Sequence, residues 1–294
     1  MYELTVLTKR NILIFIRDKV AVFFSFFSVI ILLGLYILFL KNAYINDWLK
    51  TIYQPNEIDF FANSLLLSGI LVINTVTLSL GNLGNIITDF EKKIINSFLV
   101  TPVKRFKIIF SHYLSSLIIT YVFSLIMWLL AVLIVGFTTS IWYSLPVVII
   151  ISGLLLVFTF ISTGLMIFIT TFITSVNAFG AISGVLGTVI GFISGIYMPL
   201  SILPKAVQNI SSLIPFTHMT ALMKNYLLEP SFNLITLENK EEIILTIKET
   251  YNIGNIPIFN IEINMVWILL VSCFISFLFL GIATQRLSKK IGKK

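Results

Sequence analysis

The sequence predicts an all-α integral membrane protein, and three observations support that prediction. The chain of 294 residues is 57% hydrophobic and only 11% charged, with a mean hydropathy of +1.01, too few charges to cover a soluble domain. Several uncharged runs reach the roughly 20 residues that a helix needs to cross a bilayer. These runs lack the alternation of apolar and polar residues that is typical of barrel strands, so we expect helices.

Six membrane spans are predicted, and an even number places both termini on the same side. The whole chain, residues 1–294, is expected to form a single transmembrane domain. The lone Cys273 cannot form an internal disulfide, and the early charges argue against a removable signal peptide. The predicted spans are residues 20–40, 61–86, 108–136, 145–172, 178–198 and 264–283.

The basic residues predict the orientation. Fourteen of the 20 lysines and arginines lie in the N-terminal segment, in residues 88–107 and in the C-terminal tail. The positive-inside rule therefore predicts a plasma-membrane protein with both termini in the cytoplasm. The net charge of +7 is attributed to this topology and to lipid head groups, so nucleic acid is not an expected partner.

Residues 1–19 are expected to form an interfacial amphipathic helix along the inner leaflet. Glu3, Arg10 and Arg17 recur every seven residues, which puts them on one helical stripe, with most apolar side chains off it. The alternative is an irregular basic flank that only orients the first span.

Residues 200–263 are predicted to form an extracellular loop region with short helices. Ser201 is the expected cap of the first helix, Pro204 lies in its first turn, and Pro215 separates it from the second. The acidic stretch 238–252 predicts a third, solvated helix.

The spans lack the residues of most catalytic and ion-coupled sites. They contain no Asp, Glu, Lys or Arg, and the two histidines, His112 and His218, are expected at opposite membrane faces. This argues against a membrane hydrolase and against a carrier with charged relays. His112 is interpreted as an interfacial residue and not as a ligand. The chain also has no G-x-x-x-x-G-K-[ST] loop, so energy from ATP would have to come from a partner.

Residues 88–107 form a charged island between two uncharged runs. Thr88 and Glu91 fit a capping box, Asp89 suits a helix N-terminus, and Pro102 predicts the end of the helix near residue 100. Apolar residues between them recur at helical spacing, so a short amphipathic helix is expected. Its two interpretations are a docking element and a helix lying on lipid head groups.

The island resembles the coupling segment of ABC-2-type transporter permeases, which runs acid-x-acid, a short amphipathic stretch, then [ST]-P-x-x-R. Here these are Asp89-Phe-Glu91, KKIINSFLV and Thr101-Pro-Val-Lys-Arg105. Residues 179–223 also look like this family, with a Gly-rich span, a Gly-x-x-x-Pro break and a short outer helix. The family's usual Gly-Thr pair and later Glu are replaced by Lys93-Ile94 and Asn96, which leaves the subgroup open; the daunorubicin and multidrug-resistance group is the suspected one.

The resemblance implies a half-transporter that binds no cofactor itself. Two copies of a separate ATP-binding subunit would hold ATP and Mg, and a second permease, expected to be the same chain, would complete the membrane path among the lipids. We expect apolar side chains of the island to fill a groove on the ATPase, with charged residues at the rim. The residues predicted for this coupling are Glu91, Lys92, Ile95, Phe98, Leu99, Thr101, Pro102 and Arg105.

Small residues in the fifth span predict close helix packing, either within one subunit or between two. The Gly-x-x-x-Pro break predicts a span that stops short and turns back near the outer leaflet. The packing glycines are Gly180, Gly184, Gly187, Gly191 and Gly195, and the prolines of the break and turns are Pro199, Pro204 and Pro215.

The sequence therefore predicts the membrane subunit of an ATP-driven exporter for a drug, antibiotic, toxin or lipid-like amphiphile. Within the family, the alternative is export of a surface polysaccharide or its lipid-linked precursor. Outside it, the alternatives are an ATP-independent carrier or channel and a membrane scaffold. A charge-free interior favours an apolar or amphiphilic substrate over a bare ion.

Overall fold

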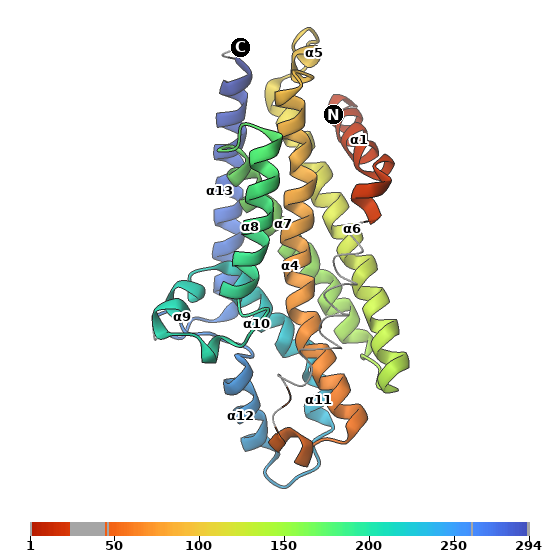
Figure 1. The fold of residues 1–294 in the computed structure, drawn as a ribbon, viewed down its shortest axis with the longest axis vertical. Coiled ribbons are helices and arrows are strands. Elements are labelled where there is room, and N and C mark those ends of the chain that lie inside the picture. Colours follow the sequence, from red (N-terminus) through yellow and green to blue (C-terminus); the bar gives the residue numbers. More distant parts are fainter. Residues whose placement is uncertain (1, 24–44, 46, 260, 293–294) are drawn as a thin grey trace.

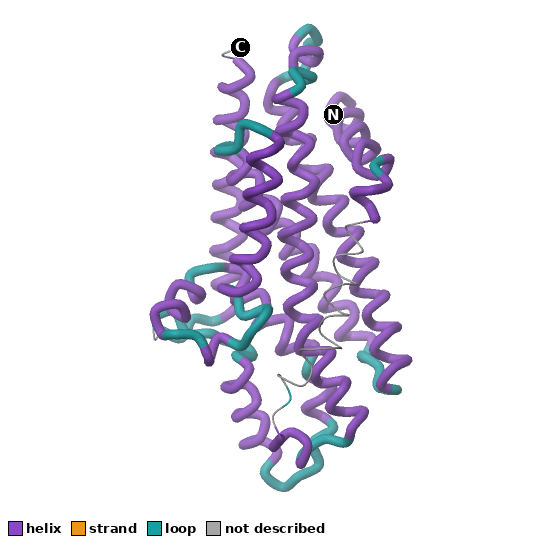
Figure 2. The backbone as a smooth tube through the Cα atoms, in the orientation of Figure 1, coloured by secondary structure: helices purple, strands orange, loops and turns teal. Residues whose placement is uncertain are grey.

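The computed structural model describes residues 2–23, 45, 47–259 and 261–292, and in these the regular elements are helices (Figures 1 and 2). Five of the described helices are long and apolar enough to cross a membrane: α4, α6, α7, α8 and α13. The all-α membrane class is therefore confirmed. The predicted first span, 20–40, falls mostly outside the described residues.

The five spans agree with their predicted positions and are mostly longer. Their bounds are α4 Pro55–Glu91, α6 Arg105–Thr139, α7 Leu145–Thr170, α8 Val176–Ile193 and α13 Met265–Gly292. The extensions are charged or polar turns that hydropathy excludes from a span but that continue the same helix. The helix α4 begins six residues before the predicted boundary. Pro55 lies in its first turn, and the Glu57 carboxylate accepts a hydrogen bond from the backbone amide of Gln54.

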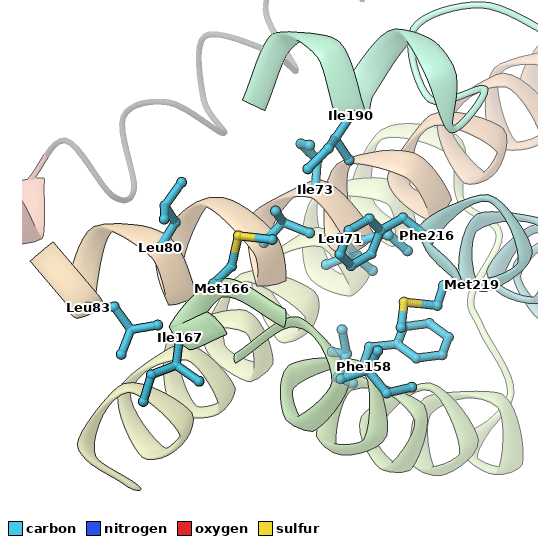
Figure 3. Close-up of a cluster of buried hydrophobic side chains, with 14 of the residues drawn as sticks. Leu71, Ile73, Leu80, Leu83, Phe158, Met166, Ile167, Ile190, Phe216 and Met219 are labelled. Carbon is cyan, nitrogen blue, oxygen red and sulfur yellow. The ribbon is translucent and has the colours of Figure 1, made fainter. Parts of the chain in front are cut away.

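The helix α4 is the centre of the bundle. It packs against α6, α7, α8 and α10 (Pro215–Leu227). Figure 3 shows its side chains Leu71 and Ile73 within the main core, together with Ile190 of α8 and Phe216 and Met219 of α10. The core thus joins the spans to a helix that the sequence places in an outer loop.

The region 200–263 contains the expected short helices, but one of them is not a surface helix. A 3-10 turn, η3 Leu200–Ile202, is followed by α9 Lys205–Ser212, α10, α11 Glu229–Asn233 and α12 Lys240–Tyr251. Pro204 and Pro215 precede or begin α9 and α10 as expected, whereas Ser201 does not cap α9: its hydroxyl donates to the Thr250 carbonyl oxygen. Nine residues of α10 are buried, so the helix belongs to the bundle.

A second apolar cluster lies at the end of the bundle away from the termini. Phe61 and Leu65 of α4 meet Ile247 and Tyr251 of α12 there, with the 3-10 helix η2 Asp47–Thr51 contributing Leu49. The acidic helix α12 is therefore amphipathic and packed on one face, which corrects the expectation of a solvated helix. Lys224 of α10 is buried beside this cluster and donates to the Tyr251 carbonyl oxygen over 2.9 Å.

The predicted break in the fifth span is confirmed. The helix α8 ends at Ile193, and Gly195 adopts φ +68°, a conformation that favours glycine. The amides of Ile196 and Tyr197 then bond back to the Gly191 carbonyl oxygen, and Pro199 leads into η3. The span therefore stops five residues before its predicted end and the chain turns back toward α9.

Candidate functional site

Both termini, the helix α1 Tyr2–Arg17 and the short helix α5 Ile95–Leu99 lie at one end of the bundle, called here the terminal end (Figure 1). The first and last described helices therefore share this end with the island, and its position on the cytoplasmic side stays a prediction. The helix α5 projects furthest from the spans at this end.

The island is built differently from the predicted capped helix. Thr88 is inside α4, where its hydroxyl donates to the Gly84 carbonyl oxygen, so it caps nothing. The helix α4 continues to Glu91, and the chain then bends at Lys93, which has φ +58°. Only Ile95–Leu99 forms a second helix, and it ends just before Thr101 and Pro102 as predicted. Most of the apolar residues do lie in helices, as their spacing predicts, but the bend at Lys93 places them in two separate helices.

Asp89 is the centre of a buried ion pair. Its carboxylate is bonded twice by the Arg10 guanidinium, with Nη1–Oδ2 at 2.7 Å and Nη2–Oδ1 at 3.0 Å. The Asp89 side chain is 5% exposed and the Arg10 side chain 28% exposed. A forked, charge-assisted pair of this kind fixes both distance and orientation. The pair therefore fastens α1 to the end of α4.

His112 of α6 completes this cluster. Its Nε2 lies 3.4 Å from Asp89 Oδ2, and its side chain is 2% exposed. His112 is therefore buried at the meeting point of α1, α4 and α6, and its interpretation as an interfacial residue stays a prediction. Next to it, Asn11 Nδ2 donates to Ser111 Oγ over 3.2 Å.

The helix α1 is fixed by its charged stripe as well as by its apolar residues. Glu3 accepts from Lys107 Nζ over 2.6 Å, and this bond holds the pKa of Glu3 below its ordinary value. Leu7 and Phe15 are buried against the bundle. The amphipathic helix was predicted correctly, but Glu3 and Arg10 of its stripe point to the bundle and not to lipid head groups.

The predicted coupling residues divide into buried and accessible ones. Ile95 is 4% exposed and belongs to the chain's own core, which corrects its assignment as an anchor for a partner. The Phe98 ring is half-buried under the Arg10 guanidinium, 5.2 Å from the ring centroid. Val100, 88% exposed, and Phe106 offer apolar surface that the predicted set omitted. The exposed polar and proline members of that set are Glu91, Lys92, Thr101, Pro102 and Arg105.

Glu91 connects the island to the fifth span. Its Oε2 accepts from the Val176 amide over 2.6 Å, at the first residue of α8. Ser175 adds the side-chain cap, accepting from the Ala178 amide. A carboxylate suits the positive end of a helix, so Glu91 caps α8 and not, as predicted, a helix of the island.

The C-terminal helix is tied to the same end. Lys290 lies over the Phe90 ring at 5.2 Å, and Arg286 lies over the Phe172 ring at 4.9 Å. Cation–ring contacts of this kind add modest stabilisation near the surface. Together these contacts make the terminal end a cluster in which four spans and α1 meet.

The predicted packing glycines do not share one role. A side chain at Gly180 or Gly184 would meet nothing within 4 Å, whereas Gly187 faces Thr77 of α4 at 3.5 Å. Gly191 and Gly195 are enclosed by Tyr197 and Leu200 at the break. Packing within the subunit therefore accounts for Gly187, Gly191 and Gly195, whereas no described residue covers the Gly180–Gly184 face.

Hydroxyl and amide side chains link the spans internally. Thr75 bonds Ser162 over 2.9 Å, Ser79 bonds Thr163 over 2.8 Å, and Asn74 donates to Ser124 over 3.3 Å. These pairs join α4 to α6 and α7. Away from the Asp89 cluster, the described interior of the spans is held by neutral hydrogen bonds.

The fold is that of a multi-pass helical membrane protein with a kinked island at its terminal end. The chain belongs to the ABC-2 type transporter family, whose model matches residues 2–228, from α1 to the end of α10. It is therefore a permease subunit of an ABC transporter, a kind of protein that works with an ATP-binding partner subunit. A search of curated proteins found no match.

The Asp89 cluster and the role of Glu91 were not foreseen. Arg10, Asp89 and His112 are 79 and 23 residues apart along the chain, and no local pattern relates them. A signal was nevertheless present: Asp89 and Arg10 are charges next to apolar runs, where a charge requires a partner.

Proposed function

We propose that this permease binds its ATPase through the surface formed by α5 and the turn that follows it. The observation that carries the proposal is the projection of α5 beyond the spans with Val100 almost fully exposed. The exposed apolar Val100 and the exposed charged residues near it in sequence, Lys92, Lys104 and Arg105, have the composition of a small docking site: an apolar anchor with a charged rim. The terminal end is then cytoplasmic, as the basic residues there predict.

The proposed mechanism transmits motion from α5 to α1 and to the spans through two contacts. ATP-driven closure of the ATPase subunits displaces α5. Arg10–Asp89 carries the displacement to α1, and Glu91–Val176 carries it to α8. Both contacts are charge-assisted and involve a side chain within a few residues of α5, so they remain coupled to its position.

The second permease is proposed to be another copy of this chain, packed on the open face of α8. Gly180 and Gly184 allow the close approach of a helix, and this face has no occupant within the described residues. The path between two such subunits would be lined by uncharged side chains. We therefore propose export of a drug, antibiotic, toxin or lipid-like amphiphile.

The docking site is tested by purifying the tagged chain from native membranes and identifying the ATPase that comes with it. Val100→Asp and Phe98→Asp are expected to lose the ATPase at least tenfold, since a buried charge opposes an apolar contact. Ile202→Asp is the matched control, because Ile202 is 67% exposed but lies near α9, away from the terminal end. Retention of the ATPase by both variants would contradict the site.

The dimer is tested with Gly184→Leu. A Cβ at this position meets nothing within 4 Å among the described residues, so the variant should fold and lose self-association in single-molecule photobleaching. Gly281→Leu is the control, because Gly281 is also a helical glycine with open space around its Cβ. Unchanged dimerisation of Gly184→Leu would exclude this face.

The substrate class is tested in inverted vesicles that contain the permease and its ATPase. Vanadate-sensitive accumulation of an amphiphilic dye supports the exporter, and accumulation without ATP indicates a carrier. A surface polysaccharide that is lost from the cell on deletion, with unchanged drug sensitivity, would favour the alternative substrate.

A further inference from the structure

A groove lies between α7, α10 and α13, away from the terminal end. Its volume is about 370 Å³, within the range of natural ligand sites. Its lining residues on α13 recur from Trp267 to Phe279, so it follows that helix for about 18 Å at ~1.5 Å per residue. It is therefore long and narrow.

The groove is apolar except near one histidine. Ser212, His218 and Ser272 are its polar lining residues, and the Ser272 hydroxyl is already bonded to the Ile268 carbonyl oxygen. His218 is 1% exposed, and its Nε2 lies 2.7 Å from the Ser212 carbonyl oxygen. A carbonyl oxygen only accepts, so Nε2 carries the hydrogen and Nδ1 carries a lone pair.

The lone pair of His218 Nδ1 is unused. This atom is buried and has no hydrogen-bond partner among the described residues. Burial lowers the pKa of His218, so the ring is neutral at pH 7 and Nδ1 is an acceptor. A buried acceptor without a donor costs free energy, which a bound donor would recover.

The position of the groove indicates how an occupant would lie. Trp267, in the first turn of α13, is 65% exposed, and exposed tryptophans prefer the membrane–water interface. The helix α10, which carries His218, lies beside these first turns of α13 (Figure 1). The acceptor is therefore close to head-group level, and the apolar part of the groove extends into the bilayer toward Phe279.

We propose that this groove binds a single-chain membrane amphiphile whose head group donates a hydrogen bond to His218 Nδ1 and whose chain lies along α13. The occupant would enter from the surrounding leaflet, since Val271 and Ile275 line the groove and are also exposed on the lipid-facing surface. A helix from a second copy is about 10 Å across and is too bulky for a groove of this length and volume. The proposal does not depend on ATPase docking or on the transported substrate.

The test uses the full-length chain in phosphatidylcholine nanodiscs with a photoreactive probe, hexadecanol carrying a mid-chain diazirine. After illumination, mass spectrometry maps the labelled peptides. We expect label concentrated on α13 and on α7 around Leu165, and about fivefold less label from the methyl ether of the same probe, which has no hydrogen to donate.

Two variants refine the test. Ser272→Phe should fill the groove and reduce labelling at least fivefold, whereas Phe277→Trp, an exposed position of α13 outside the groove, should not. If Ser272→Phe does not fold, the difference in labelling between the alcohol probe and its methyl ether on the unaltered chain still tests the proposal. Equal labelling by the two probes, or label spread evenly over the lipid-facing helices, would overturn the proposal.

Discussion

The helices α4 and α8 have equally hydropathic cores and opposite surroundings. In the most hydropathic stretch of α4, 89% of residues are buried, against 11% in α8. The helix α4 carries Ser, Thr and Asn side chains that bond α6 and α7, whereas Gly180 and Gly184 of α8 face no other described residue. Hydropathy therefore locates a span, whereas the partners of its small and polar residues determine whether the span is central or peripheral.

The largest effect is expected where α4 is tied to α1. Arg10→Met leaves the Asp89 carboxylate buried without its guanidinium, and loss of one partner of such a pair costs about 3–5 kcal/mol. Fluorescence-detected thermal unfolding in detergent measures the change. Lys107→Met, which breaks the more exposed pair with Glu3, should cost less than about 1 kcal/mol. Equal losses in the two variants would contradict a buried role for Asp89.

The next effect concerns Lys224 on α10, a helix that also packs against α4. Burial lowers the pKa of Lys224 to about 8, so the unfolded chain holds this proton over a pH range in which the folded chain has released it. The unfolding free energy should therefore rise with pH between about 8 and the ordinary lysine value, by up to about 3 kcal/mol.

Lys224→Met is the control for that pH dependence. It removes the titrating group, so the rise between pH 8 and 10 should disappear while the helices remain folded. A rise of the same size in the variant would assign the pH dependence to other groups.

Substitutions at one glycine of α7 and one of α8 compare the stability cost of a side chain at a buried and at an open helix face. A Cβ at Gly164 of α7 would overlap Ser276 Oγ and lie 2.8 Å from the Ser276 carbonyl oxygen. Gly164→Ala should therefore destabilise by roughly 1–3 kcal/mol through overpacking. Gly184→Ala in α8 should be neutral or gain up to about 1 kcal/mol in helix propensity. Thermal unfolding of the dissociated subunit distinguishes them, and a loss at Gly184 would show that its face is covered.

The smallest effect is expected from one interhelical hydroxyl. Ser79→Ala removes the bond to Thr163, and such bonds in membranes contribute about 0.6 kcal/mol. Thr188→Val in α8 removes only a bond to the Gly184 carbonyl oxygen of its own helix and should change the unfolding free energy by less. Similar values would show that the hydrogen bonds do not distinguish the two spans.

The sequence predicted the spans because each depends on a local property, an uncharged run of sufficient length. It predicted the break at Gly195 and the starts near Pro204 and Pro215 for the same reason, since each is set by one residue's backbone preference. It failed at Thr88 because a capping-box pattern cannot show that an earlier helix has already passed through it. The partners of Asp89 and Glu91, and the burial of α10, depend on which distant helices meet.

The sequence predicted a short helix in the island but not its detailed structure, and the binding of an ATPase there stays a prediction. The island does form the projecting tip of the terminal end, yet helical spacing alone put Ile95 and Phe98 on one exposed face. The bend at Lys93 turns Ile95 into the core and leaves Val100 outward. A residue with positive φ that is not glycine gives little warning in a sequence.

The length of α4 has a consequence of its own. Its 37 residues extend for about 55 Å, whereas the hydrocarbon layer is about 30 Å thick. One unbroken helix therefore connects the Asp89 cluster at one end with the second apolar cluster, which contains Phe61, at the other. Both clusters lie outside the apolar layer or at its edge. A tilt of about 5° shifts one end by about 5 Å relative to the other. A rigid helix of this length couples any displacement of its Asp89 end to a displacement of its Phe61 end.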